Sequence, residues 1–240
     1  MYILQNARRS LFAGAVMVTL AACGGGGGGG TSAPAPTPPA SVPLAAAIAY
    51  GSNHAISINM SISGTVNGVA VTGSASYTEA AAVATTFKGA PALSQALSVT
   101  GSVTGNGQTF PYSSTGVGYE NSSYQAIGYQ DSTTYEVAAA PFSYPATVSV
   151  GDTGQAGIYQ KYSDVTMNTP TGTEKDSYIV QADPASSTDL IVVYVAQNYD
   201  TGNNLTGTTN TYFKITTAGV PSLSSVTVQS TSGSLTFTAQ

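Results

Sequence analysis

The sequence predicts an all-β protein built from antiparallel hairpins and a meander, arranged as two β lobes of the sandwich or half-barrel type. Two observations support this fold class. Apolar and polar residues alternate over several short segments, which is typical of strands with one buried face. Asn-Gly pairs stand between such segments, and this pair is the strongest short signal for a hairpin turn. The composition agrees, because charged residues make up only 7% while hydrophobic residues reach 42%.

The clearest hairpin lies near the start of the β region. Residues 56 to 62 are apolar at every second position, and Asn67-Gly68 follows shortly after them. A two-residue turn fixes the register, so Met60 should oppose Ala75 on the same face. The same turn places Ile58 opposite Tyr77. Large side chains then meet small or aromatic ones, which predicts a packed inner face.

A second hairpin is expected at Asn106-Gly107, with Val103 opposite Phe110. The sequence offers one helix candidate, from Glu79 to Thr85, which is rich in alanine but short and without a capping residue.

Pro141 and Pro145 interrupt the pattern, so we place a boundary between an N-terminal lobe (44–145) and a C-terminal meander lobe (146–240). Every residue from Leu190 to Ala196 is apolar, which predicts a central strand covered on both faces. The strands of the second lobe are expected near 158–163, 177–182, 190–199, 211–217, 223–229 and 235–238.

The N-terminal segment is typical of export. Arg8 and Arg9 precede an uncharged run from Ser10 to Ala22, which is shorter than the roughly 20 residues of a membrane span. Charge followed by a short apolar run predicts a secretory signal peptide over 1–22. The arginine pair leaves a twin-arginine signal open as an alternative.

The run ends in Leu20-Ala21-Ala22-Cys23, which resembles the lipobox of Gram-negative bacterial lipoproteins. The resemblance implies that the chain is cut before Cys23, that palmitate and other acyl chains modify this residue, and that the mature protein is held at a membrane. Because Gly24 stands where an Asp favours the inner membrane, the resemblance implies the outer membrane, on its periplasmic or its surface face. The alternative is that Cys23 is an ordinary thiol.

Residues 23–43 predict a flexible tether, because Gly24–Gly30 is a run of seven glycines and prolines follow it. As a whole, the layout of acylated Cys, tether and β body resembles uncharacterised β-rich envelope lipoproteins. That likeness implies no particular activity.

The composition argues against several functions. Six Lys and Arg residues are too few for a surface that binds nucleic acid. The chain has one His, one Cys and no Trp, and such a composition excludes most metal sites and triads, in which His54 would have to take part without a second imidazole. We therefore assign no catalytic residue, no metal ligand and no cofactor, and Cys23 is the one site residue.

Three groups of acidic residues are candidates for hydrolysis or for calcium binding. Glu174 and Asp176 should share one face of a strand, with Lys175 on the other face, at a solvated strand end. Asp152 lies in Gly-Asp-Thr-Gly, and Asp200 begins Asp-Thr-Gly-Asn-Asn; both segments predict turns. The 15 tyrosines are compatible with strand positions or with a surface that stacks on sugars.

These observations predict a non-catalytic binding or structural β module, anchored to the membrane through Cys23. One alternative is a carrier of an apolar or lipid ligand in a half-barrel; another is a hydrolase that uses carboxylates. An envelope protein, a glycan or an apolar molecule would each fit as a partner.

Overall fold

The computed structural model describes residues 41–240, and this part of the chain folds into one helix and thirteen strands. The helix is α2 (Leu44–Asn53). The strands are β1 (Ile56–Val66), β2 (Val69–Glu79), β3 (Val83–Phe87), β4 (Ala90–Gly105), β5 (Gln108–Glu120), β6 (Ala126–Asp131), β7 (Tyr135–Ala138), β8 (Thr153–Tyr162), β9 (Pro170–Ala182), β10 (Asp189–Tyr199), β11 (Leu205–Thr216), β12 (Pro221–Ser230) and β13 (Gly233–Ala239).

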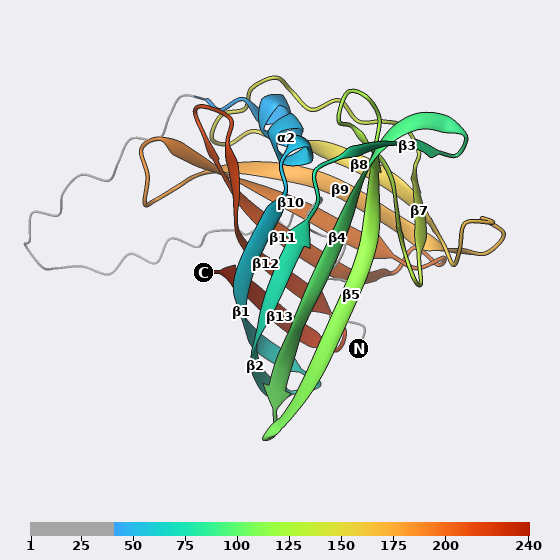
Figure 1. Cartoon of the computed structure of the whole chain (residues 1–240). Coiled ribbons are helices and arrows are strands. Elements are labelled where there is room, and N and C mark those ends of the chain that lie inside the picture. Colours follow the sequence, from blue (N-terminus) through green and yellow to red (C-terminus); the bar gives the residue numbers. More distant parts are fainter. Residues whose placement is uncertain (1–40) are drawn as a thin grey trace, which may run out of the picture.

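The strands form a closed, fully antiparallel barrel (Figure 1). Each strand from β4 to β13 pairs with the next, β13 pairs with β1, β1 pairs with β2, and β2 pairs with β4. Only β3 stands outside this ring, along the edge of β4. The all-β prediction is confirmed, but the sandwich or half-barrel arrangement is replaced by a closed ring.

Two glycines permit the pairing of β2 with β4 that closes the ring. A Cβ atom on Gly73 would lie 2.1 Å from the carbonyl oxygen of Ser102, and one on Gly101 would lie 2.2 Å from that of Ser74. Real side chains cannot approach so closely, so these positions accept no larger residue without moving the strands apart.

Both predicted hairpins have the predicted registers. Met60 opposes Ala75 and Ile58 opposes Tyr77 in the first hairpin. Val103 opposes Phe110 in the second. Asn67 and Gly68 both have positive φ, 50° and 78°, as a type I′ turn requires.

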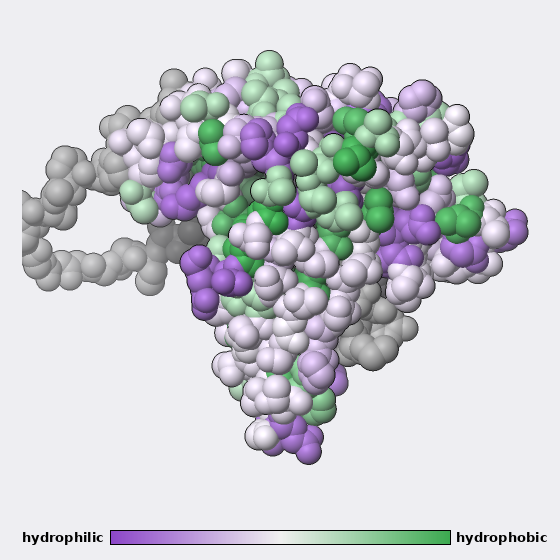
Figure 2. Space-filling model, viewed as in Figure 1, coloured by the Kyte–Doolittle hydropathy of each residue, from purple (hydrophilic) through white to green (hydrophobic). Residues whose placement is uncertain are grey.

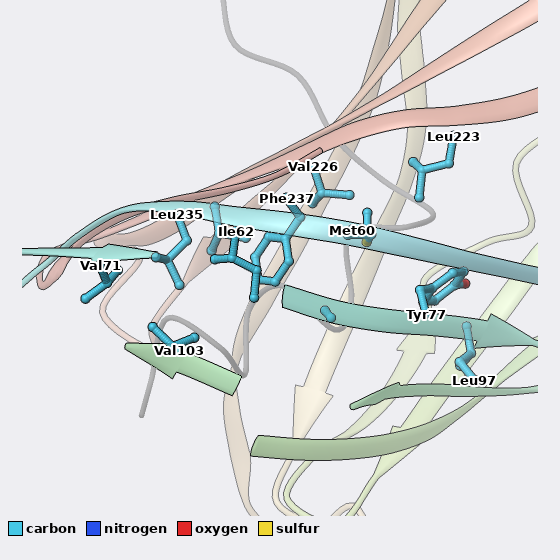
Figure 3. Close-up of a cluster of buried hydrophobic side chains, with 12 residues drawn as sticks. Met60, Ile62, Val71, Tyr77, Leu97, Val103, Leu223, Val226, Leu235 and Phe237 are labelled. Carbon is cyan, nitrogen blue, oxygen red and sulfur yellow. The ribbon is translucent and has the colours of Figure 1, made fainter. Parts of the chain in front are cut away.

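The lower part of the barrel is filled by apolar side chains (Figure 3). The inward faces of β1, β2, β4, β12 and β13 meet there, and Ile62 lies opposite Phe237. The buried members of this cluster are Met60, Ile62, Val71, Ala75, Tyr77, Leu97, Val103, Leu223, Val226, Val228, Leu235 and Phe237. Alternating positions along the strands therefore supply the core, as the sequence pattern indicated.

The predicted meander is present. β8 to β13 follow one another around the barrel, and β10 lies between β9 and β11. From Leu190 to Ala196 every residue except Ile191 is buried. The proposed boundary at 145/146 falls between β7 and β8, which pair directly with each other. Strands from both proposed lobes thus belong to one ring.

The helix prediction was wrong. Glu79 ends β2, and β3 begins at Val83, because β-branched and aromatic residues follow the alanines. The helix of the described chain is α2, which begins directly after Pro43 and whose sequence, LAAAIAYGSN, is rich in alanine. This helix was not predicted from the sequence, because it is only ten residues long and its last three residues are Gly, Ser and Asn, which disfavour a helix.

Residues 1–22, Cys23 and Gly24–Gly30 lie outside the described residues, so the signal peptide, the lipid attachment and most of the tether remain predictions. Within residues 41–240, α2 is too short to cross a bilayer, and no other helix qualifies.

Candidate functional site

The helix α2 covers one end of the barrel and is held there from both sides (Figure 1). Before the helix, Val42 forms a two-way backbone bridge with Val148, at 2.9 Å in each direction. Leu44 and Ala47 are buried in a cluster with residues of β9, β10 and β11. In the last turn of the helix, the carbonyl of Ser52 accepts a hydrogen bond of 2.7 Å from the backbone N–H of Ala82. The helix is thus fixed over the barrel end.

A cavity of about 330 Å³ lies beneath α2. This volume falls at the lower end of the range for small-molecule sites. Its walls are mostly apolar, and seven elements contribute, together with Gln240 after the last strand: α2 (Ala47, Ile48, Gly51), β1 (Ile56, Ile58), β2 (Glu79), β10 (Tyr194), β11 (Phe213, Ile215), β12 (Pro221, Ser222, Leu223) and β13 (Ala239). Figure 2 shows hydrophobic surface just below α2, where the first strands begin.

Two aromatic rings form one wall of the cavity. Tyr194 and Phe213 come from neighbouring strands and meet edge to face, with ring centroids 5.9 Å apart. Tyr194 is 2% exposed, and its buried hydroxyl has no hydrogen-bond partner among the described residues. This wall of the cavity is therefore aromatic, and one of its two residues carries a buried hydroxyl without a partner.

Among the described residues of the lining, Glu79 is the one with an acidic side chain of the Asp or Glu type. It is 5% exposed, and its Oε2 accepts a hydrogen bond of 2.5 Å from the hydroxyl of Tyr77. Its Oε1 is buried without a partner among residues 41–240. Burial raises the pKa of Glu79 to about 7, and the charge of Glu120 adds to this increase, while the bond from Tyr77 opposes it. Near neutral pH this carboxyl can therefore be either protonated or charged.

A second buried carboxyl stands beside the end of α2. Glu120 Oε1 accepts a hydrogen bond of 3.0 Å from the Ser52 hydroxyl. Gln95 Nε2 donates to the carbonyls of Ser52 and Ala80, at 3.4 and 3.2 Å. Burial raises the pKa of Glu120, although the bond from Ser52 lowers it in part. These contacts tie the last turn of the helix to β4 and β5.

A further group of ionisable residues is buried on β7 to β10. Glu136 opposes Lys161, with Oε1 and Nζ 3.7 Å apart, and Lys161 also donates to Asn198. Glu174 and Asp176 follow on β9, 3% and 4% exposed. Burial raises the pKa of Asp176 well above its usual range, and the charges of Glu174 and Glu136 add to this effect.

This burial corrects one prediction. Glu174 and Asp176 do share a face, and Lys175 lies on the other face over the ring of Tyr199, at 4.3 Å from its centroid. The pair is not a solvated strand end, however. β9 lies within the ring between β8 and β10, so its inward face is covered. Neither carboxyl lines the cavity beneath α2.

The other predicted positions lie at the surface. His54 follows α2 and is exposed; its ring stacks on Tyr50 and its Nδ1 donates to the carbonyl of that residue at 2.7 Å. Asp152 accepts the backbone N–H of Ser149 at 2.8 Å, in the predicted turn. In the second predicted turn, Asp200 Oδ1 accepts a hydrogen bond of 2.8 Å from the backbone N–H of Asn204.

No cluster of three or more metal-ligating residues occurs in the described part of the chain. The tyrosines divide between two environments. Five are buried on strands, and the other described tyrosines are partly exposed or exposed; the buried ones are Tyr77, Tyr135, Tyr159, Tyr178 and Tyr194.

Glu79 was not among the predicted site residues, although the sequence carries a signal for it. The register that places Ile58 opposite Tyr77 also places Ile56 opposite Glu79, on the same inward face. Following the alternation to the end of β2 would have shown a carboxyl on an apolar face.

Comparison with known proteins gives little guidance. The chain matches no family model, and no curated protein matches it. A crystal structure of a DUF1329 family protein from Desulfovibrio piger is similar to 83% of this chain and to 92% of its own length, with 10% sequence identity and a TM-score of 0.33. A likeness this distant transfers no function to the chain.

Proposed function

We propose that this chain is a membrane-anchored envelope protein whose barrel binds a small apolar molecule bearing one polar group. The binding is non-catalytic. The observation that carries the proposal is the cavity of about 330 Å³ beneath α2, with apolar walls and a single carboxyl among them. Its form favours a binding or carrier role over a purely structural one, because a structural core is packed without such space.

The lining explains how binding would occur. Transfer of an apolar molecule from water to these walls is favourable by roughly 25 cal/mol per Å² of surface buried. The polar group of the ligand would reach the unpartnered Oε1 of Glu79 or the hydroxyl of Tyr194. One oriented polar contact within an apolar cavity is the usual design of small-molecule sites.

The position of the tether supports the membrane part of the proposal. The predicted linker ends at residue 43, and α2 begins at Leu44, directly over the cavity. Acyl chains on Cys23 would thus hold the cavity end of the barrel near the membrane. Apolar molecules partition into membranes, so this end would meet them there.

Replacement of Gly51 tests the site. Gly51 lines the cavity, and a Cβ there would lie 4.0 Å from Pro221 Cγ, in ordinary contact. Gly51→Leu should fill the cavity while improving helix propensity by about 1 kcal/mol. Gly51→Ala is the matched control, because it changes the backbone in the same way but leaves most of the space.

The readout is native mass spectrometry of the full chain, released from a non-ionic detergent in the presence of decanol. We expect the parent protein and Gly51→Ala to retain bound decanol, and Gly51→Leu to lose it while its melting temperature stays the same or rises. Equal binding by all three proteins, or no binding by any of them, would show that the cavity is not a ligand site.

A further inference from the structure

The charges around the cavity select among possible polar groups. We propose that the ligand is cationic: an amine or other ammonium compound with an apolar body, whose positive charge lies between the carboxyl of Glu79 and the aromatic ring of Tyr194. This proposal rests on the proposed function and specifies the chemical class that the same cavity takes.

Glu79 supplies the first part of the argument. Glu79 lines the cavity, and its Oε1 is buried with no partner among the described residues. The groups that act on it are the hydroxyl of Tyr77 and the carboxyl of Glu120, and neither is a cation. A buried carboxylate without a positive partner is costly, so an ammonium group would satisfy it. A carboxylate ligand would instead add a like charge.

The end of α2 adds to the same potential. Gly51, in the last turn of the helix, lines the cavity, and the next residue, Ser52, contacts Glu120. A helix C-terminus carries partial negative charge and favours cations nearby. Two carboxyls and a helix C-terminus thus surround this part of the barrel.

The aromatic wall favours a cation as well. Tyr194 and Phe213 both line the cavity. An ammonium group over an aromatic face is attracted by the negative charge of that face, most strongly where water is excluded. Tyr194 also offers a hydroxyl oxygen that accepts a hydrogen bond, while an ammonium group has only donors to give. Carboxylate, hydroxyl and ring face are therefore all complementary to the same type of ligand.

The test compares three molecules with equal chains: decylamine, decanol and decanoate. Each is titrated into the full chain in non-ionic detergent at pH 8, and the bound fraction is read by native mass spectrometry. We expect decylamine to bind about tenfold more tightly than decanol, as one buried charge pair allows, and decanoate to bind weakest. Micelles take up each molecule equally for all variants, so ratios between variants report the protein.

The variant Glu79→Gln should abolish the preference for decylamine over decanol, since it keeps the shape and the acceptor for Tyr77 but removes the charge. Asp164→Asn is the matched control. Asp164 is an exposed acid away from the cavity, so the preference should remain there. If Glu79→Gln does not fold, the parent protein still tests the proposal: the preference should grow between pH 5 and pH 8, as Glu79 loses its proton.

Two negative outcomes are distinguishable. Equal binding of decanol and decylamine by the parent protein, or tighter binding of decanoate, would refute a cationic ligand and leave the cavity as an apolar site. Failure of all three molecules to bind would refute the proposed function itself.

Discussion

Glu79 combines two properties that a merely structural residue rarely needs. It is almost completely buried, yet only one of its two carboxyl oxygens has a partner among the described residues. Removing a carboxylate from water without a cation raises its pKa, because the protonated form is easier to bury. At a pKa of about 7 the folded protein retains a proton on Glu79 that the unfolded chain has already lost.

This retained proton predicts how stability depends on pH. The pKa of Glu79 is raised from 4.5 to about 7 on folding, so between these values the folded state binds more protons and the free energy of unfolding falls as pH rises. The effect of this one group is at most about 3 kcal/mol between pH 4 and pH 8. In Glu79→Gln the free energy of unfolding should fall less between pH 4 and pH 8, by up to about 3 kcal/mol. Urea denaturation at several pH values across this range measures the difference.

Other groups set the background of that measurement. Asp176 also has a raised pKa, so a residual fall with pH is expected in Glu79→Gln. Asp164→Asn should keep the full fall, since the hydrogen bonds to Thr166 lower the pKa of Asp164 rather than raise it. Identical pH profiles for the parent protein and Glu79→Gln would mean that Glu79 has no raised pKa in the folded state.

Hairpins with two-residue turns are the elements that assemble this barrel. Asn67-Gly68, Lys88-Gly89 and Asn106-Gly107 all have positive φ at both positions. This geometry matches the right-handed twist of the flanking strands, so each turn fixes the register of the two strands that it joins. A register fixed at the turn is carried along β1 and β2 to Ile56 and Glu79, at the cavity.

Replacement of a turn glycine should therefore destabilise the hairpin. At Gly68 a Cβ would meet no atom within 4 Å, so Gly68→Ala changes only the backbone preference. With φ at 78°, we expect a loss of about 1–2 kcal/mol in the free energy of unfolding. Gly118→Ala is the matched control, because its Cβ would also meet nothing and its φ is not positive. Equal melting temperatures for the two variants would contradict a type I′ turn at Asn67-Gly68.

At the scale of the whole molecule, the interior of the barrel has an apolar region and a region with buried ionisable residues. Apolar side chains fill the part between β1, β2, β4, β12 and β13, while acids and one lysine lie along β7 to β9. The cavity lies at the end that α2 covers, and the predicted tether joins the barrel at that same end. The proposed anchor and the proposed site thus belong to one arrangement.

The anchor gives the prediction at this scale. Lipid attachment requires the sulfur of Cys23, and stable residence at a membrane requires more than one acyl chain. Cys23→Ser should therefore abolish incorporation of labelled palmitate. The protein should then appear either as uncleaved precursor or as a species released from the outer membrane, when label and fractionation are read together. A Cys23→Ser protein that still carries label and still sediments with outer membranes would overturn the lipoprotein assignment.

The sequence by itself determined the local structure. Alternation and Asn-Gly turns predicted the strands of both hairpins and their registers, because a two-residue turn leaves no freedom in the pairing that follows it. Turns at Asp152 and Asp200 were predicted from residues that bond to their own backbone, a preference that needs no distant partner.

Only the tertiary structure decided which strand faces are buried inside the barrel. Pairing of β2 with β4, and of β1 with β13, joins segments that no local turn connects in that order, so the barrel could not be derived from the pattern. That closure buries Glu174 and Asp176, which looked like a solvated strand end, and it places Glu79 beside Tyr194 in one cavity. The physical reason is that burial depends on long-range neighbours, while propensity and turn chemistry act within a few residues.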